Sequence, residues 1–273
     1  MEADEFARPS GAVTESELVG RKDDGDHVEL LVLRNPKVNA LSTALLAQLE
    51  THVAAIEADR DVRAVIVTGD GPYFSAGADL KEIATLGIDA APKVALRGRE
   101  LFERLSALRP PVLAAINGLA LGGGLELALA CDLRVAGESA KLGAPEVNYG
   151  LLPAYGGTQR LARLLGRSKA MEMVFTGTML PAAEAGRIGL VNKVVPAGQE
   201  LRATRDLAHT IAQKAPRAVA GAKRAIRLGL ELPLHEGMRL EGEQFETEVL
   251  GSEDLGEGIL AFVEHRPPKF TGK

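Results

Sequence analysis

The hydrophobic positions of the chain follow two alternating patterns, short unbroken apolar runs and longer segments of helical spacing. The unbroken runs predict buried strands over 63–68, 111–116, 132–136 and 190–195. The intervals between them predict helices over 43–59, 80–85, 92–108, 123–131, 157–166 and 168–176. Because unbroken apolar strands separated by helices are typical of a sheet covered on both faces, we expect an α/β fold.

The two ends of the chain have patterns of their own. Near the start, the segments 17–21 and 27–34 flank Asp23-Asp24-Gly25-Asp26, a turn sequence that predicts a β-hairpin. From about residue 199 onward, helices are expected over 199–214, 216–229, 233–250 and 253–264. We therefore predict a flexible N-terminal arm over 1–15, a core over 16–197 and a helical region over 198–273 that packs on the core or on another subunit.

Composition and charge exclude several classes of protein. With 46% hydrophobic residues and a net charge of only −5 among 273 residues, general disorder is excluded. The acidic balance offers no global attraction for nucleic acid or an anionic membrane, so any anion site must be local. The acidic N-terminus without an apolar segment, the lack of a long apolar run and the lone Cys131 predict a cytoplasmic protein. The five histidines lack paired ligand spacing, so we expect no metal site.

The first segment that could carry chemistry is 73–80, between a predicted strand and a helix. Its small residues, with Gly77 among them, let a ligand approach the backbone, and amide groups at a helix start can receive an oxygen anion. An ordinary tight turn is the alternative. Ser75 as a nucleophile is a weaker one, because Tyr73 stands where the G-x-S-x-G pattern requires glycine.

The second segment, 117–132, contains three consecutive glycines, Gly122 to Gly124, at a predicted helix start. It matches neither G-x-G-x-x-G nor Walker A, so the glycines indicate close approach of a ligand or of a neighbouring helix. Glu126 shares a helical face with Gly123 amid apolar neighbours, and burial there would raise its pKa and suit proton transfer. A buried glutamate satisfied by backbone amides is the alternative. Asp132 is interpreted as a structural hydrogen-bonding group.

The third segment, 143–161, places Glu146 after a proline in a glycine-rich loop, and Gly156-Gly157 opens the next helix. A solvated loop carboxylate is the alternative interpretation of Glu146. Taken together, the three segments predict one site. Two sets of amide groups would converge on a developing oxyanion, and two carboxylates would move protons on either side of a reacting bond.

At these residues the sequence resembles the enoyl-CoA hydratase/isomerase family, the crotonase superfamily. The likeness runs from about residue 17 to the end and is carried by Asn35-Pro36-x-x-Asn39-Ala40-Leu41, Phe74 to Lys81, the 117–132 segment, Pro145-Glu146 and Gly156 to Leu161. The resemblance implies a spiral of ββα turns followed by helices that form trimers, commonly paired into hexamers. It also implies an acyl-CoA thioester substrate, with coenzyme A entering as part of the substrate and no separate cofactor.

The resemblance assigns roles to individual positions. The thioester oxygen would lie between the backbone amides of Ala78 and Gly123. Glu126 would work with the attacking water, and Glu146 would serve protonation at the carbon next to the thioester. The presence of both glutamates favours hydration of a 2-enoyl-CoA over isomerisation or other reactions of the family.

Further positions are implied to bind substrate or water. Ala154 would offer its amide to the catalytic water, and Lys37 lies beside the matching loop. The C-terminal tail resembles segments that reach a neighbour's nucleotide. The substrate-binding and CoA-binding positions implied are Val38, Ala40, Ala76, Asp79, Leu80, Lys81, Gly122, Lys269 and Phe270.

Two departures from the family pattern limit what can be transferred. Ala154-Tyr155 stands where Gly-Ala is usual, and Leu142 stands where Phe is common, so both are expected to alter the pocket. The segment 84–100 would form the acyl-pocket wall without revealing its selectivity. A lyase or isomerase acting on a specialised acyl-CoA, a thioester hydrolase using Ser75 and a non-catalytic acyl-CoA or RNA binder are the alternative functions.

Overall fold

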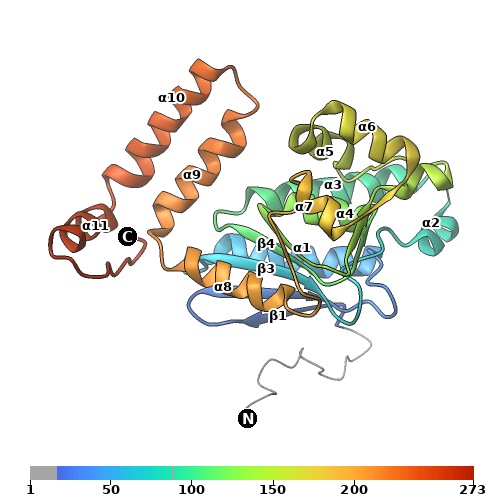
Figure 1. Ribbon diagram of the computed structural model, residues 1–273, viewed down its shortest axis with the longest axis horizontal. Helices are drawn as coiled ribbons and strands as arrows, with labels where there is room; N and C mark the ends of the chain where they lie inside the picture. Colours follow the sequence, from blue (N-terminus) through green and yellow to red (C-terminus); the bar gives the residue numbers. More distant parts are fainter. Residues whose placement is uncertain (1–16, 88) are drawn as a thin grey trace, which may run out of the picture.

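A six-stranded sheet forms the centre of the computed structural model, which describes residues 17–87 and 89–273 (Figure 1). Its strands lie in the order β1 (Val19–Asp23), β2 (Val28–Leu33), β3 (Ala64–Gly69), β4 (Val112–Ile116), β6 (Leu133–Gly137) and β9 (Lys193–Val195). Strand β1 pairs antiparallel with β2 as the predicted hairpin, and all other pairs are parallel. The predicted N-terminal arm, 1–15, lies outside the described residues.

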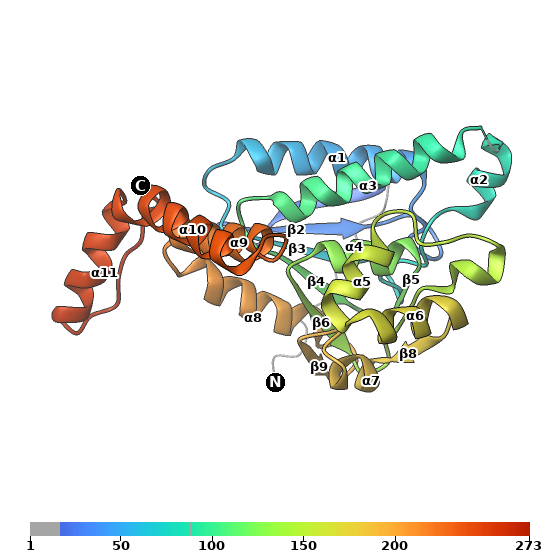
Figure 2. The same ribbon diagram turned by 90° about the horizontal axis from the view of Figure 1, so that it is seen from above.

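The alternation of side chains along each strand explains why the strand sequences are apolar throughout. In β4, Val112, Ala114 and Ile116 join the larger core cluster, whereas Leu113 and Ala115 join a second cluster on the opposite face. Helices α1 (Thr43–Ala58), α3 (Ala91–Ala107) and α4 (Gly123–Ala130) cover the first face, and α8 (Glu200–Ala212) covers the second (Figure 2). The predicted α/β class with a doubly covered sheet is confirmed.

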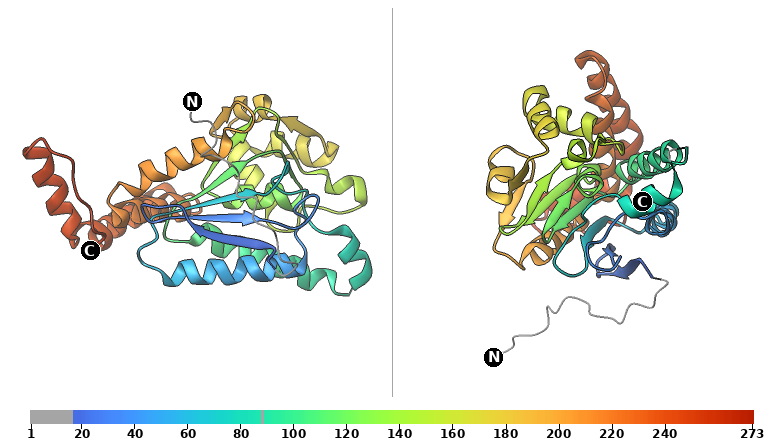
Figure 3. Two further views of the ribbon diagram at one scale, coloured as in Figure 1. Left: turned by 90° about the horizontal axis from the view of Figure 1, so that it is seen from below. Right: turned by 90° about the vertical axis from the view of Figure 1, so that its right-hand side faces the viewer.

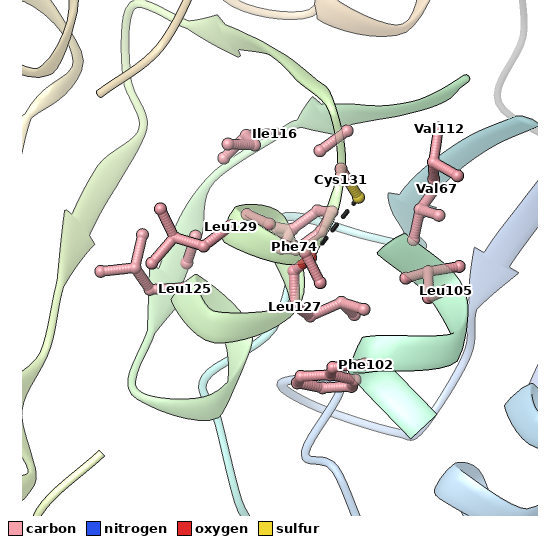
Figure 4. Packing of buried hydrophobic residues seen from close by; sticks show 14 of the residues in the cluster. Val67, Phe74, Phe102, Leu105, Val112, Ile116, Leu125, Leu127, Leu129 and Cys131 are labelled. Carbon is pink, nitrogen blue, oxygen red and sulfur yellow. Dashed lines mark hydrogen bonds between the residues drawn. The ribbon is translucent and has the colours of Figure 1, made fainter. Parts of the chain in front are cut away.

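The larger core cluster packs around helix α4, which is buried on every side (Figure 4). Phe74 and Phe102 fill the space beside it, and Cys131 donates a hydrogen bond from its Sγ to the Leu127 carbonyl at 3.4 Å. Burial raises the pKa of the Cys131 thiol to about 12, so this thiol stays protonated and unreactive. Helix α4 is thus held in a fixed position.

Three strands that the sequence pattern did not predict form a second, smaller sheet. They are β5 (Leu119–Leu121), β7 (Lys141–Gly143) and β8 (Met179–Pro181). With three residues each, they are too short to show an alternation, and their pairing depends on contacts far apart in sequence. The strand predicted over 190–195 is shorter in the structure, where β9 begins at Lys193. Leu190 and Val191 are apolar because they are buried in the turn before the strand. Helix α7 (Ala182–Arg187) also lay outside the prediction.

The remaining elements of the core surround its carboxyl edge. They are α2 (Leu80–Leu86), the 3-10 helix η1 (Pro145–Tyr149), α5 (Gly157–Leu165) and α6 (Arg167–Thr176). The expected helix α1 begins as predicted, since the Ser42 side chain accepts a hydrogen bond from the Leu45 amide at 3.2 Å. No helix within the described ranges has the length and apolar character needed to cross a lipid bilayer.

The helical region 198–273 has two structurally different parts. Helix α8 packs on β3, β4 and β6 and therefore belongs to the core. Helices α9 (Pro216–Gly229), α10 (Leu234–Gln244) and α11 (Glu253–Val263) form an extension that projects away from the core (Figures 1 and 3). The helix expected over 233–250 ends in a π-helical segment, η2 (Phe245–Leu250). The Lys223 ammonium of α9 pairs with the Asp132 carboxylate at 2.7 Å and ties the extension to the core.

Candidate active site

The three predicted segments meet in one region of the fold, where 73–80 follows β3, 117–132 follows β4 and 143–161 begins at the end of β7 in the smaller sheet. A cavity of about 180 Å³ lies there, and its walls are mostly apolar. Each segment contributes to the lining: Ala76, Gly77, Ala78 and Leu80 from the first, Gly122, Gly123 and Glu126 from the second, and Glu146, Ala154 and Tyr155 from the third. The predicted convergence of the segments is therefore present in the fold.

Two backbone amides at the pocket have no hydrogen-bond acceptor in the part of the chain that the structure describes. Within the described residues, neither the Ala78 amide nor the Gly123 amide donates a hydrogen bond. Gly77 has φ +97°, and a Cβ there would lie 3.1 Å from the Gly123 nitrogen and 2.6 Å from the Leu121 carbonyl oxygen. Only glycine fits this conformation and this space, so the two loops can bring their unpaired amides to one place.

The consecutive glycines of the second segment each have a different neighbour. A Cβ at Gly124 would lie 2.3 Å from the Ser75 carbonyl oxygen, whereas one at Gly122 would lie 3.2 Å from a Glu146 carboxylate oxygen. A Cβ at Gly123 would contact Leu41 and Tyr155. Close approach of other loops, rather than of a neighbouring helix alone, therefore explains the three glycines.

Ser75 has a structural role, which argues against its interpretation as a nucleophile. Its side chain is fully buried. Its hydroxyl donates to the Asn39 carbonyl oxygen at 2.8 Å and accepts from the Gly77 amide at 3.2 Å. These bonds use the hydroxyl to shape the loop that carries Ala78, and Ser75 is not among the described residues that line the pocket.

Asparagine side chains hold the same loop from two sides. The Asn39 Nδ2 donates to the Asp70 and Tyr73 carbonyl oxygens, at 2.9 and 2.8 Å. The Asn117 Nδ2 donates to the Gly69 and Gly71 carbonyl oxygens, at 2.9 and 2.8 Å. This positioning role was not predicted from the sequence for either residue, although both occur in the motifs described above.

Glu126 is buried in the first turn of α4, with 3% of its surface exposed. Its Oε1 accepts hydrogen bonds from the Tyr155 amide at 2.8 Å and the Gly157 amide at 2.7 Å. Burial raises the pKa of this carboxyl to about 7, the nearby Glu146 raises it further, and the two amide bonds oppose the rise. The carboxyl is held by backbone amides, as the alternative interpretation expected, and burial raises its pKa, as the first interpretation expected. Proton transfer by Glu126 stays a prediction.

Glu146 lies in η1 and lines the pocket beside Gly122. The residue is half-buried, but both carboxylate oxygens are inaccessible to solvent and neither meets a donor from another described residue. Burial raises the pKa of this carboxyl as well. A solvated loop carboxylate is thus excluded, and an unpartnered buried carboxyl facing a pocket is a group available for proton transfer.

The Tyr155 side chain lies inside the molecule and lines the pocket, with 4% of its surface exposed. Its ring packs edge-on against Phe102, with ring centroids 5.5 Å apart. Burial raises the pKa of the Tyr155 phenol to about 12, and the nearby Glu126 adds to the rise, so the hydroxyl stays neutral. Leu142, expected to alter the pocket, instead lies fully buried in the larger core cluster and is absent from the lining.

The implied substrate-binding positions divide into two groups. Ala76, Leu80 and Gly122 line the pocket. Ala91, Val94 and Ala95 of the 84–100 segment form part of its wall, together with Ile83 just before that segment. Val38 and Ala40 contribute backbone carbonyl oxygens that accept hydrogen bonds from the Ala76 amide and the Asn35 side chain. The Asp79 carboxylate caps α2 by accepting from the Lys81 and Glu82 amides, and the Lys37 and Lys81 side chains are exposed.

The C-terminal tail does not reach this pocket within one chain. Lys269 is exposed beside α11, and its amide donates to the Glu257 carboxylate at 2.7 Å. The Phe270 carbonyl oxygen accepts from Arg63 at 2.8 Å. Figure 2 shows the extension on the opposite side of the core from α2, which borders the pocket. No group of three or more metal-ligating side chains occurs within the described part of the chain.

Comparison with known proteins gives consistent matches. The family model for enoyl-CoA hydratase/isomerase matches residues 24–273. A probable mitochondrial enoyl-CoA hydratase of Dictyostelium discoideum is 43% identical over 90% of this chain and 88% of that protein. The 2,3-dehydroadipyl-CoA hydratase of Escherichia coli is 41% identical over 94% of this chain and 100% of that protein. The crystal structure of a Bacillus anthracis enoyl-CoA hydratase is 40% identical, covers 94% of this chain and 100% of that one, and has a TM-score of 0.92.

Proposed function

The chain belongs to the enoyl-CoA hydratase/isomerase family and has the crotonase fold, and we propose that it is an enoyl-CoA hydratase that adds water reversibly to a 2-enoyl-CoA thioester. One observation carries the assignment to this site. Two carboxyls with raised pKa values and two unpaired backbone amides line one apolar pocket. Hydration of a conjugated thioester needs these groups.

In this proposal the thioester oxygen accepts hydrogen bonds from the Ala78 and Gly123 amides. Adding water to the double bond moves negative charge onto that oxygen, and each such donor is worth about 3 kcal/mol in the transition state. The two amides are held in place before the substrate binds, because Gly77 and the bonds of Ser75 fix their loop. The protein therefore spends no energy on reorganising them during the reaction.

The two glutamates handle the protons of the same step. The Glu126 carboxylate accepts a proton from water as the water oxygen bonds to C3, and the Glu146 carboxyl donates a proton to C2. The product is the 3-hydroxyacyl-CoA, and the reverse reaction eliminates water along the same path. The Ala154 amide, at the edge of the pocket, would help to hold the water. A pKa near 7 suits Glu126 to accept and return a proton near neutral pH.

Coenzyme A and assembly complete the proposal. CoA phosphates need local cations on an acidic chain, and the exposed Lys37 and Lys81 lie on the matching loops.

Large apolar side chains of the extension are exposed, which favours a homotrimer or a hexamer made of two trimers, with Lys269 and Phe270 reaching a neighbour's nucleotide. The most exposed of them are Ile226, Leu230, Leu234, Met238, Phe262 and Val263. The lone, unreactive Cys131 fits a reducing cytoplasm, and hydration of this kind would serve fatty-acid β-oxidation.

The test is the loss of the crotonyl-CoA absorbance at 263 nm, with a panel of other 2-enoyl-CoA esters beside it. We expect hydration by the wild type and strong loss in Glu126→Gln. A protein inert on every straight-chain ester would contradict the proposal and favour a lyase or isomerase acting on a specialised acyl-CoA. Release of free CoA, detected with a thiol reagent and abolished in Ser75→Ala, would instead establish the hydrolase that the buried Ser75 argues against.

A further inference from the structure

The pocket has two tyrosines in its lining, and they occupy opposite environments. Tyr149 is 64% exposed, whereas Tyr155 is 4% exposed. Tyr155 therefore closes the inner part of the pocket, and Tyr149 lies at its opening.

Helix α3 shows where the pocket ends. Its Ala91, Val94 and Ala95 line the pocket, but no described residue of α3 beyond Ala95 does so. At the next turn is Gly98, where a Cβ would lie 2.6 Å from the Tyr155 Cε1. Phe102 follows on the same helical face and packs against the same ring. The ring thus fills a recess at Gly98 through which the pocket would otherwise continue along α3.

The other edge of the ring lies beside the oxyanion site. A Cβ at Gly123 would be 3.2 Å from the Tyr155 Cδ2 and Cε2. The ring is therefore held between Gly98 and Gly123, and it cannot turn away without displacing one of the two helices. Its hydroxyl forms no hydrogen bond within the described residues, so the ring acts by its volume.

We propose that Tyr155 limits the length of the acyl chain and makes short 2-enoyl-CoA esters the preferred substrates. This inference rests on the proposed function, which places the thioester oxygen at the Gly123 amide. An acyl chain that starts there meets the ring within a few carbons, because even a Cβ on Gly123 would lie 3.2 Å from the ring. Longer chains must displace the ring or leave through the pocket opening.

The experiment measures kcat and KM for four-, eight- and twelve-carbon 2-enoyl-CoA esters in the wild type and in Tyr155 variants. We expect the wild-type kcat/KM to fall at least about tenfold from four to eight carbons, since poor accommodation of even one methylene costs about tenfold or more. Tyr155→Ala should raise the eight-to-four-carbon ratio at least about tenfold, mainly through KM. Tyr155→Phe should retain the wild-type profile, because the hydroxyl has no partner. The backbone amide that holds Glu126 is present in every variant.

Control variants distinguish a Tyr155 ring that limits acyl-chain length from one that only contributes to packing. Tyr155→Leu keeps apolar contact with Phe102 and serves if Tyr155→Ala does not fold. Phe175→Ala removes an aromatic ring that is 70% exposed on α6 and should leave the profile unchanged. An unchanged chain-length ratio in a folded Ala or Leu variant, or a wild type equally active on eight carbons, would overturn the role of Tyr155. A wild type inert on every ester would refute the proposed function and this inference with it.

Discussion

Glu126 and Glu146 differ in how their carboxyl groups are held. One oxygen of Glu126 accepts two backbone amides, whereas Glu146 meets no donor from another described residue. A buried polar group without a partner costs free energy, and proteins keep such groups where chemistry uses them. This difference supports the proposed division of roles, in which the fixed carboxylate of Glu126 accepts a proton from water and the carboxyl of Glu146 donates a proton to C2.

We predict that Glu126→Gln and Glu146→Gln each reduce kcat for crotonyl-CoA hydration at least about a hundredfold. General acid–base groups contribute roughly 10²–10⁴-fold, and glutamine keeps the size and an acceptor oxygen but not the proton transfer. Steady-state kinetics with circular dichroism as the folding control makes the measurement. Near-wild-type turnover in either variant would remove that carboxyl from the mechanism.

The raised pKa of Glu126 also predicts a dependence of stability on pH. Because the native state holds this proton more tightly than the unfolded chain, the carboxyl stabilises the fold below pH 4.5, and this contribution is lost as the pH rises to about 7. Glu126→Gln lacks the titration, so its free energy of unfolding relative to wild type should rise between pH 5 and 8, by up to about 3 kcal/mol. Urea unfolding at the two pH values tests this, with Glu100→Gln at an exposed site of α3 as the matched control. If the free energy of unfolding of Glu126→Gln relative to wild type stays constant or falls between pH 5 and 8, burial does not raise the pKa of Glu126 as argued.

At the scale of elements, the site depends on loops that pass each other without side chains between them. Gly77 and Gly71 both have positive φ, +97° and +70°. Only Gly77 is crowded, because a Cβ at Gly71 would meet nothing within 4 Å. Substituting each glycine therefore separates the effect of backbone strain from the effect of blocking the proposed oxyanion site.

We predict that Gly77→Ala lowers both stability and kcat, whereas Gly71→Ala lowers stability alone. Strain at positive φ costs roughly 1–2 kcal/mol in both variants. The added methyl of Gly77→Ala must also displace the Leu121 carbonyl or the Gly123 amide, and losing one oxyanion donor costs about a hundredfold or more in kcat. Thermal unfolding and crotonyl-CoA kinetics measure the two effects. Equal losses of kcat in the two variants would show that strain alone is responsible.

Most helices and strands could be predicted because residues close in sequence determine them. The others could not, because they depend on contacts between residues far apart in sequence. The Ser42 cap and the Asp23–Asp26 turn act over a few residues, so α1 and the first hairpin were predicted from the sequence. The strands β5, β7 and β8 depend on each other and carry no pattern of their own. The same contrast applies to the site. The two glutamates lie in motifs that can be recognised in the sequence, whereas the space that Tyr155 fills exists because a separate helix, α3, has a glycine at position 98.

At the scale of the whole molecule, the extension is joined to the core by polar contacts and leaves apolar side chains uncovered. Lys223 pairs with Asp132, and Arg227 pairs with Glu103 of α3 at 2.8 Å. The side chains of Leu230 and Phe262 are 81% and 80% exposed. Apolar exposure of this extent on one extension is typical of an interface, and it supports the proposed trimer or hexamer, in which the tail of one subunit would lie near the pocket of another.

Mixed oligomers test whether the tail works in a neighbour's site. We predict that Lys269→Ala raises KM for crotonyl-CoA with little change in kcat, because a cation near a CoA phosphate contributes binding without taking part in the reaction. Co-expression of Lys269→Ala with Glu126→Gln then creates sites that combine an intact Glu126 with an intact Lys269 from the neighbouring subunit. At low substrate concentration, these preparations should exceed the summed activity of the two variants produced separately.

Leu230→Glu provides the control, because a charge at this exposed apolar position should weaken association and shift the sedimentation coefficient towards that of a monomer. Introduced into both partners, it should abolish the gain from co-expression, since complementation needs contact between subunits. A purely additive mixture that still sediments as an oligomer would show that Lys269 does not serve a neighbouring pocket. In that case the CoA phosphates must be bound by cations of the same chain, and Lys37→Ala and Lys81→Ala become the variants expected to raise KM.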